Sequence, residues 1–369
     1  MTRARDVSRL ITTPPNVYAT DSEASAGFLS LSSASSIYEG APYRNLIING
    51  DMQIAQRGTS TASITTDGYR TADRWYANLS SLGTWTQSVE NDAPTGSGFR
   101  NSLKMLCTTA DASPAAGDNL SIQQRVEGQN LQQIKKGTAA AEQLTLSFWV
   151  KSNVTGTYIA NISDIDNTRQ VSKSYTINAV NTWEREVITF SADTTGAFDN
   201  DNALSMVVSL WLGSGTTYTS GTLETTWAST TNANTAVGQV NLASATNNYW
   251  QVTGVQLEVG DTATPFEFKP FPQNLRECQR YYYAYSNSGL SDTPYFRSVY
   301  VSSPPNSSAA CDMYFPTTMR IAPTTITSVL NSGSVSRQTA TTNMVVFQLA
   351  STAGGGAYNV TSYTVSAEL

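Results

Sequence analysis

Residues 253–283 read TGVQLEVGDTATPFEFKPFPQNLRECQRYYY, and they show where one structural unit ends and another begins. Val255 and Leu257 alternate with Gln256 and Glu258, which is the period of a β-strand with one buried face. The Gly-Asp pair that follows is typical of a turn. The sequence therefore predicts the last strand of one domain at the start of this stretch.

The second half of the stretch predicts an extended, non-helical crossing and then a new module. The extended crossing is predicted from Pro265, Pro270 and Pro272, because proline fixes φ and disfavours helix at the residue before it. A dense run of tyrosines follows, with members Tyr281, Tyr282, Tyr283 and Tyr285. Such rings can fill an interface between sister subunits or contact a receptor at a distal tip. A small module with few charges favours the subunit interface.

The composition indicates β-structure with many turns, or an oligomer that hides surface. Charged residues make up only 14% of the 369 residues, against about a quarter in an ordinary globular domain. The net charge is −6 and no run of Lys and Arg is longer than a pair, so no nucleic-acid partner is expected. No apolar run is long enough to insert in a membrane. The first residues lack the apolar centre of a secretory signal, so we expect synthesis in a cytoplasm without secretion.

The absence of histidine removes several kinds of chemistry at once. It excludes Ser-His-Asp and Cys-His nucleophile systems and His-ligated zinc. Catalysis that uses only carboxylates, as in glycosidases, does not need histidine and is not excluded. Cys107, Cys278 and Cys311 are too few and too widely spaced for a disulfide framework or a metal site. We expect three buried thiols, with a Cys278–Cys311 bridge as the alternative.

Short apolar runs separated by Gly, Asn, Asp and Ser predict an all-β chain. Between the two ends of the first domain the expected strands are 102–108, 119–126, 143–152, 157–163, 182–192, 204–213 and 248–259. In the last module they are 279–286, 295–303, 310–319, 324–330, 342–351 and 359–369. Many short strands without a sustained 3.6-residue period indicate an antiparallel sandwich or jelly roll. Residues 127–136 are the one stretch that predicts a short helix.

Two motifs carry a resemblance to a known family. NLIINGDMQIAQRG at 45–58, with DGYRTADRW at 67–75, resembles the opening of β-sandwich domains in bacteriophage tail fibres and related virion appendages. GVQLE at 254–258, ATPFE at 263–267 and CQRYY at 278–282 resemble the close of such a domain and its junction to a C-terminal module. The resemblance implies a carbohydrate-binding-module-like jelly roll over residues 43–268 and a smaller β domain over 269–369. It implies an intertwined or packed homotrimer and a place in the virion.

Residues 1–42 differ from the rest in composition. Three arginines alternate with apolar residues, and a Ser-, Ala- and Gly-rich tract follows a pair of prolines. Such a tract cannot offset its ordering cost alone. It is either a disordered tail or a segment that orders on a partner. Its start resembles the N-terminal attachment peptides of phage appendages, which implies docking onto other tail or baseplate proteins.

Strand alternation predicts a candidate glycan-binding face. Trp149 and Lys151 point away from the predicted core of their strand, Trp211 away from that of another, and Gln256 away from that of the last. An aromatic ring stacks on a pyranose while amide and charged groups bond its hydroxyls. The alternative is that a neighbouring subunit, a loop or the N-terminal segment covers this face. Of the other tryptophans, Trp75, Trp183 and Trp250 are expected in the core or as plugs at the sandwich edge, and Trp85 and Trp227 at loop tips.

Paired carboxylates occur in two loops, Asp164 with Asp166 and Asp199 with Asp201. Three interpretations are open: turn residues, a structural calcium site or a catalytic pair. The candidates for the calcium site are Asp199 and Asp201. The turn interpretation is favoured, so we expect no enzyme activity and no cofactor. The function expected is a structural virion subunit, a tail fibre or tail-tip protein that attaches to the host surface. The alternatives are a free carbohydrate-binding adhesin, a capsid decoration protein and a polysaccharide depolymerase, the last disfavoured because no coil repeat of a β-helix occurs.

Overall fold

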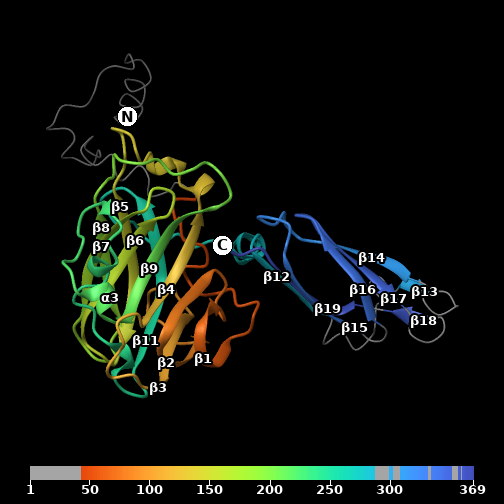
Figure 1. Ribbon diagram of the computed structural model, residues 1–369, viewed down its shortest axis with the longest axis horizontal. Helices are drawn as coiled ribbons and strands as arrows, with labels where there is room; N and C mark the ends of the chain where they lie inside the picture. Colours follow the sequence, from red (N-terminus) through yellow and green to blue (C-terminus); the bar gives the residue numbers. More distant parts are fainter. Residues whose placement is uncertain (1–42, 287–298, 302–307, 331–333, 351–355, 359) are drawn as a thin grey trace, which may run out of the picture. The chain divides into compact units, whose positions relative to one another are not determined.

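The computed structural model describes residues 43–286, 299–301, 308–330, 334–350, 356–358 and 360–369. The prediction of an all-β fold with antiparallel sheets is confirmed (Figure 1). The chain divides into two units, residues 1–42 and 43–369. The predicted attachment segment 1–42 lies outside the described residues. No helix in the described part of the chain is long and apolar enough to cross a membrane.

The first domain consists of eleven strands that belong to one continuous antiparallel sheet. The strands are β1 (Ser60–Tyr69), β2 (Trp75–Glu90), β3 (Ser102–Thr109), β4 (Asn119–Glu127), β5 (Leu144–Ser152), β6 (Gly156–Asp164), β7 (Arg169–Ile177), β8 (Glu184–Phe190), β9 (Leu204–Ser214), β10 (Ala228–Ser229) and β11 (Tyr249–Val259). Short helical turns are η2 (Gly128–Asn130), η3 (Gln132–Ile134), α3 (Thr216–Thr219), η4 (Asn232–Asn234) and η5 (Leu242–Ser244).

Strand β2 joins two layers of a sandwich. Its first half pairs with β4 and its second half with β3. Between the halves, Ser81 and Gly83 have φ values of 55° and 67°, and this left-handed backbone redirects the strand. Sheet I is β10-β7-β6-β9-β4 with the first half of β2, and sheet II is the second half of β2 with β3-β11-β5-β8. Strand β1 pairs along β2.

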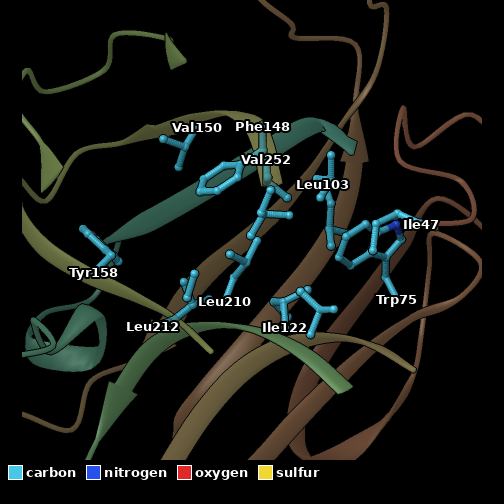
Figure 2. Close-up of a cluster of buried hydrophobic side chains, with 14 of the residues drawn as sticks. Ile47, Trp75, Leu103, Ile122, Phe148, Val150, Tyr158, Leu210, Leu212 and Val252 are labelled. Carbon is cyan, nitrogen blue, oxygen red and sulfur yellow. The ribbon is translucent and has the colours of Figure 1, made fainter. Parts of the chain in front are cut away.

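The core lies between the two sheets and is built from alternate residues of their strands. Figure 2 shows side chains from several strands pointing toward one another, among them Trp75, Phe148 and Leu210. Phe148 of sheet II packs edge-on against Tyr175 of sheet I, with ring centroids 5.1 Å apart. Each such side chain contributes about 1.5–3 kcal/mol when fully buried. The alternation that predicted the strands therefore also places the core.

Most predicted strands of this domain are confirmed, and four strands were missed, one of them the two-residue β10. The predicted runs match β3, β4, β5, β6, β8, β9 and β11. Strands β1, β2 and β7 were missed because they carry many Ser and Thr residues, which resemble turn formers when read alone. Residues 127–136 form two separate 3₁₀ turns, η2 and η3, and not a helix.

The C-terminal part contains one helix and three small antiparallel sheets in its described residues. They are α4 (Phe271–Gln279), β12 (Tyr282–Ser286), β13 (Val299–Val301), β14 (Ser308–Tyr314), β15 (Thr325–Leu330), β16 (Ser334–Ala340), β17 (Met344–Ala350), β18 (Gly356–Tyr358) and β19 (Val360–Ser366). The sheets are β12-β19-β15, β13-β18 and β14-β17-β16.

Helix α4 corrects the prediction that the crossing is extended through Pro272, and the predicted strand 279–286 is confirmed as β12 with a later start. Pro270 is the N-cap of α4 and Pro272 lies in its first turn. Proline is tolerated there because the first N–H groups of a helix have no partner within the helix. The crossing is therefore non-helical only as far as Pro270, and the strand begins at Tyr282.

The predicted tyrosine cluster packs within the chain. The rings of Tyr283 and Tyr285 lie 5.8 and 5.5 Å from that of Tyr363. The Arg74 guanidinium lies 3.5 Å from the Tyr281 ring, and Arg57 lies at the same distance from Tyr282. Tyr281 is 1% exposed, which corrects its assignment to a subunit interface, because its surface is already used inside the chain. A trimer interface at Tyr282, Tyr283 and Tyr285 stays a prediction.

Ion pairs connect β19 and α4 to the sandwich. Arg74 is fully buried and pairs with Glu368, and it also donates to the backbone oxygen of Arg125. Arg280 donates twice to the carboxylate of Glu127, at 2.9 and 2.7 Å. The three cysteines are buried and form no disulfide, as expected.

Candidate functional site

The outer face of sheet II brings together aromatic and polar side chains from four strands and two loops. Trp149 of β5 lies between Thr253 of β11 and Arg185 of β8 in the hydrogen-bonded register. One row further along the sheet, Lys151 lies beside Gln251, and Gln251 lies beside Lys104 of β3. Neighbouring strands are about 4.8 Å apart, so a row that crosses four strands is about 14 Å long. We call this surface the β5 face.

A single carboxylate organises the polar part of the β5 face. Asp92, in the loop after β2, pairs with Lys151 and accepts hydrogen bonds from Trp183 Nε1 at 3.2 Å and from Gln251 Nε2 at 3.2 Å. Burial alone would raise the pKa of Asp92, but the bonds from Lys151, Trp183 and Gln251 outweigh it and hold the pKa below its usual value. The carboxylate is therefore ionised at neutral pH and fixes three side chains in place.

Three half-buried aromatic rings lie on this face, and they are not equivalent. Lys151 Nζ is 5.1 Å from the Trp183 ring centroid, and Lys104 Nζ is 4.9 Å from that of Tyr249. The Tyr249 hydroxyl donates to Asn181 at 2.6 Å. Trp149 has no ring or cation contact with another described residue. Its indole is therefore the ring that can accept a flat ligand, while the other two rings are partly covered by lysines.

The arrangement combines one open aromatic ring with amide, ammonium and guanidinium donors. A pyranose ring buries its C–H face on an indole, and its hydroxyls exchange hydrogen bonds with groups such as Gln251 and Lys151. The groups on this face are held by Asp92 before any ligand arrives. Such pre-organisation reduces the entropy cost of binding.

The structure brings two of the four predicted glycan residues together, namely Trp149 and Lys151. Trp211 is a correction, because it lies on the outer side of sheet I and is only 5% exposed. Its ring is 5.2 Å from that of Tyr218, and it packs with Ile159 and Ala236. Alternation shows that a residue points away from its own core face, but not to which layer the strand belongs.

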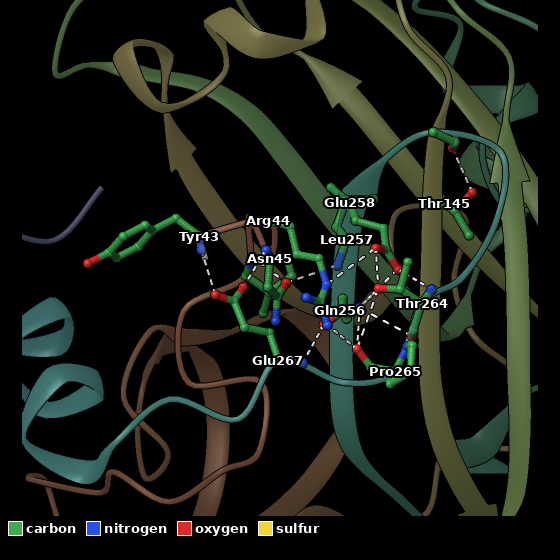
Figure 3. Close-up of polar contacts among 12 residues, drawn as sticks. Tyr43, Arg44, Asn45, Thr145, Gln256, Leu257, Glu258, Thr264, Pro265 and Glu267 are labelled. Carbon is green, nitrogen blue, oxygen red and sulfur yellow. Dashed lines mark hydrogen bonds and ion pairs between the residues drawn. The ribbon is translucent and has the colours of Figure 1, made fainter. Parts of the chain in front are cut away.

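Gln256 is a second correction, because it is fully buried and supports the fold. Its Nε2 donates to Glu258 at 2.9 Å, and its Oε1 accepts from the backbone N–H of Glu267 at 2.8 Å. Thr264 completes this group by donating from its N–H and hydroxyl to Glu258. Figure 3 shows the residues of the GVQLE and ATPFE motifs bonded to one another. The motif folds back on its own strand and covers the position that the sequence suggested for a ligand.

The structure confirms the expected positions of some of the other tryptophans and corrects those of the rest. Trp75 and Trp250 are in the core as expected. Trp85 is fully buried in the core and not at a loop tip, and Trp227 packs against the core beside Lys136. Trp183 was expected in the core or at the sandwich edge, but it lies half-buried on the β5 face, because a residue just before a strand has no alternation from which to assign its side.

Asp92, Gln251 and Tyr249 of the β5 face were also missed. Gln251 lies in a predicted strand, two residues before Thr253, and outward alternation could have identified it. Asp92 and Tyr249 lie at strand ends, where the sequence contains no signal of their meeting.

The paired aspartates behave as structural groups. Asp199 and Asp201 are exposed, and Asp201 accepts a hydrogen bond from the N–H of Ala203 in a turn. Asp164 is buried and pairs with Lys136, which also lies 3.0 Å from Asp193. The described part of the chain contains no group of three or more His, Cys, Asp or Glu residues arranged to hold a metal. The calcium candidates therefore have no supporting cluster around them.

No protein-family profile and no curated protein matches the chain. Similar solved structures include the enzymatically active domain of tailspike protein 4 of bacteriophage CBA120, at 15% identity and a TM-score of 0.31, over 59% of this chain and 22% of that one. TmCBM61 in complex with β-1,4-galactotriose matches at 10% identity and a TM-score of 0.30, over 58% of this chain and 99% of the module. A family 11 carbohydrate-binding module of a Clostridium thermocellum cellulosomal cellulase matches at 11% identity and a TM-score of 0.29, over 55% of this chain and 96% of the module. The ligands and activities in these descriptions belong to those proteins.

Proposed function

We propose that this chain is a glycan-binding, non-catalytic subunit of a bacteriophage virion appendage, and that the β5 face is its sugar site. The observation that carries the binding role is the open Trp149 indole beside polar side chains held in place by Asp92. No catalytic step is assigned to this face, because its organising carboxylate is already engaged by three donors. A general acid needs a proton and access to the leaving group.

The place in the virion and the homotrimer rest on the motif resemblance. The NLIINGDMQIAQRG and GVQLE segments contribute the contacts that close the sandwich, so both motifs have a structural role at the positions where the resemblance places them. Residues 1–42 are proposed to dock onto other tail proteins. Light scattering of the purified chain tests the oligomer, with a trimer expected and a stable monomer contradicting it.

Glycan-array binding of the full chain tests the sugar site. We expect binding to a subset of host-surface glycans, reduced at least tenfold by Trp149→Ala, because a flat ligand that stacks on an aromatic side chain, such as a nucleic-acid base, gains on the order of 1–3 kcal/mol per ring. Tyr314→Ala is the matched control, since Tyr314 is 62% exposed on β14 of the C-terminal part. Binding that is unchanged in Trp149→Ala would remove the site. Release of reducing ends from a bound polysaccharide would overturn the non-catalytic assignment.

A further inference from the structure

We propose that the sugar bound on the β5 face is acidic, with a carboxylate that Arg185 receives while the sugar ring lies on Trp149. This inference rests on the proposed glycan-binding function and names its ligand class. It adds Arg185, which neither the sequence nor the comparisons assign a role.

Arg185 lies directly across from Trp149 in the β5–β8 register. Paired residues on one face of an antiparallel sheet have Cβ atoms about 4.5–5.5 Å apart, so the guanidinium and the indole share one site. Arg185 is exposed, and its guanidinium makes no hydrogen bond or ion pair with any residue that the structure describes. A planar guanidinium with unused donors next to an open ring matches the carboxylate of a sugar that stacks on the ring.

The charges around this site favour an anion locally. Lys104, at the other end of the row, likewise has no ion pair with a described residue and contacts the Tyr249 ring. The carboxylate of Asp92 is paired with Lys151, whereas Glu90 accepts a hydrogen bond from the Ser88 hydroxyl at 2.6 Å and keeps its negative charge. The face therefore carries two cations without an ion-pair partner among the described residues, Arg185 and Lys104, against the one unpaired carboxylate of Glu90.

The overall charge of the chain has the opposite sign to the local charge of this face. Its net charge is −6, so its long-range field repels an anionic polymer. At physiological ionic strength that field is screened beyond about 8 Å, whereas a direct contact to Arg185 is not. We therefore expect binding to depend on contact with Arg185 and to be weakened only moderately by added salt.

The test compares a uronic-acid-containing oligosaccharide with the same oligosaccharide after its carboxyl groups have been reduced to alcohols. Titration of the full chain should show tighter binding of the acidic form. Arg185→Gln should weaken it about ten- to a hundredfold and leave the reduced form unchanged. Arg185→Lys should restore part of the difference, because a point charge replaces the planar fork. Arg337→Gln is the control, an exposed arginine on β16.

The outcomes separate this inference from the function on which it rests. Equal binding of the two forms, with loss of both in Trp149→Ala, overturns the acidic ligand and leaves the sugar site in place. Preference for the acidic form that persists in Arg185→Gln also overturns the inference. Failure of the chain to bind any glycan in a Trp149-dependent manner overturns both.

Discussion

The side chain of Asn45 accepts a hydrogen bond from the backbone N–H of Leu257 at 3.1 Å, although 212 positions separate the two residues. The same amide donates to the backbone oxygen of Val255 at 3.2 Å, and the N–H of Leu46 donates to the oxygen of Leu257 at 2.8 Å. The opening motif therefore lies along the part of β11 that β3 does not pair with (Figure 3). Glu267 holds it there by accepting from the N–H groups of Tyr43 and Asn45.

Asn45→Ala should destabilise the sandwich by about 1–3 kcal/mol. The substitution leaves the N–H of Leu257 and the oxygen of Val255 without a partner in a site where Asn45 is only 7% exposed. Urea unfolding of the full chain measures the change. Asn200→Ala, in the exposed loop before β9, should change the free energy of unfolding by less than about 0.5 kcal/mol. Equal effects of the two variants would contradict the role of Asn45.

Gly50→Ala should destabilise the same contact for a steric reason. A Cβ atom at Gly50 would lie 2.1 Å from the backbone oxygen of Val255, so the opening segment would have to move off β11. We expect the free energy of unfolding, measured by urea titration, to fall by at least about 2 kcal/mol. Gly117→Ala, where no atom lies within 4 Å of the added methyl group, is the control and should be close to neutral. A stable Gly50→Ala protein would show that this close approach is not needed.

Lys136→Met should be strongly destabilising, whereas Lys135→Met should not. The Lys136 ammonium is 2% exposed and is surrounded by Asp164, Asp193 and the backbone oxygens of Thr195 and Gly196. Its removal leaves the buried carboxylate of Asp164 without a cation, while Asp193 keeps its pair with Arg169, and we expect a cost of about 3–5 kcal/mol. Lys135 is 52% exposed and its pair with Glu142 contributes at most about 1 kcal/mol. Thermal unfolding of both variants checks this, and similar melting temperatures would refute the contrast.

Arg74→Met should weaken the attachment of β19 and α4 to the sandwich. It removes the buried cation that lies over the Tyr281 ring and leaves Glu368 paired with Arg57 alone, so we expect a cost below that of a fully broken buried pair, which is about 3–5 kcal/mol. The expected readout is earlier proteolytic release of the C-terminal part in limited digestion. Arg70→Met is the control, because Arg70 donates to Thr66 and Asp67 of the preceding strand β1 and to no group of the described C-terminal part. Identical digestion patterns would count against the ion pair as the connection.

Asp73 should make stability depend on pH. Burial raises the pKa of Asp73 to about 6, although Arg57 lies 3.5 Å away and Gln56 donates to it. Glu368 and the Cys278 thiol also face this group. Because the folded pKa exceeds the unfolded value of 3.8, the folded state keeps a proton that the unfolded state has already lost between about pH 4 and pH 6. This group therefore favours folding below about pH 4, and its contribution is lost as the pH rises through 6.

Asp73→Asn removes that titration. We expect the free energy of unfolding of the variant to rise relative to the wild type by up to about 3 kcal/mol between pH 4 and pH 7. Urea titrations of both proteins at several pH values measure this difference. The other titrating groups are the same in the two proteins, so their contributions cancel. The exposed Asp261→Asn is the control. A difference that stays constant across this pH range would show that Asp73 titrates as in the unfolded chain.

The sequence by itself determined the class of fold, most of the strands and the core, because side-chain alternation and turn residues act locally. The runs that became β5, β9 and β11 show their buried face in the order of their residues, and Val255 and Leu257 are buried as that order predicts. Trp149 and Lys151 were found in the same way. The helix after Pro270 was missed because proline at a helix start and proline in an extended crossing look alike in sequence.

The tertiary structure alone decided which outward-pointing residues share a surface. Trp149 and Trp211 have the same pattern around them, yet β5 belongs to sheet II and β9 to sheet I, so the two rings lie on opposite outer faces of the sandwich. Gln256 points outward as predicted, but the returning segment at Thr264 covers it. Asp92, Lys151 and Trp183 meet only because the loop after β2, strand β5 and the start of β8 are brought together across the chain. Strand pairing between distant segments is set by the packing of the whole sheet, and no local pattern encodes it.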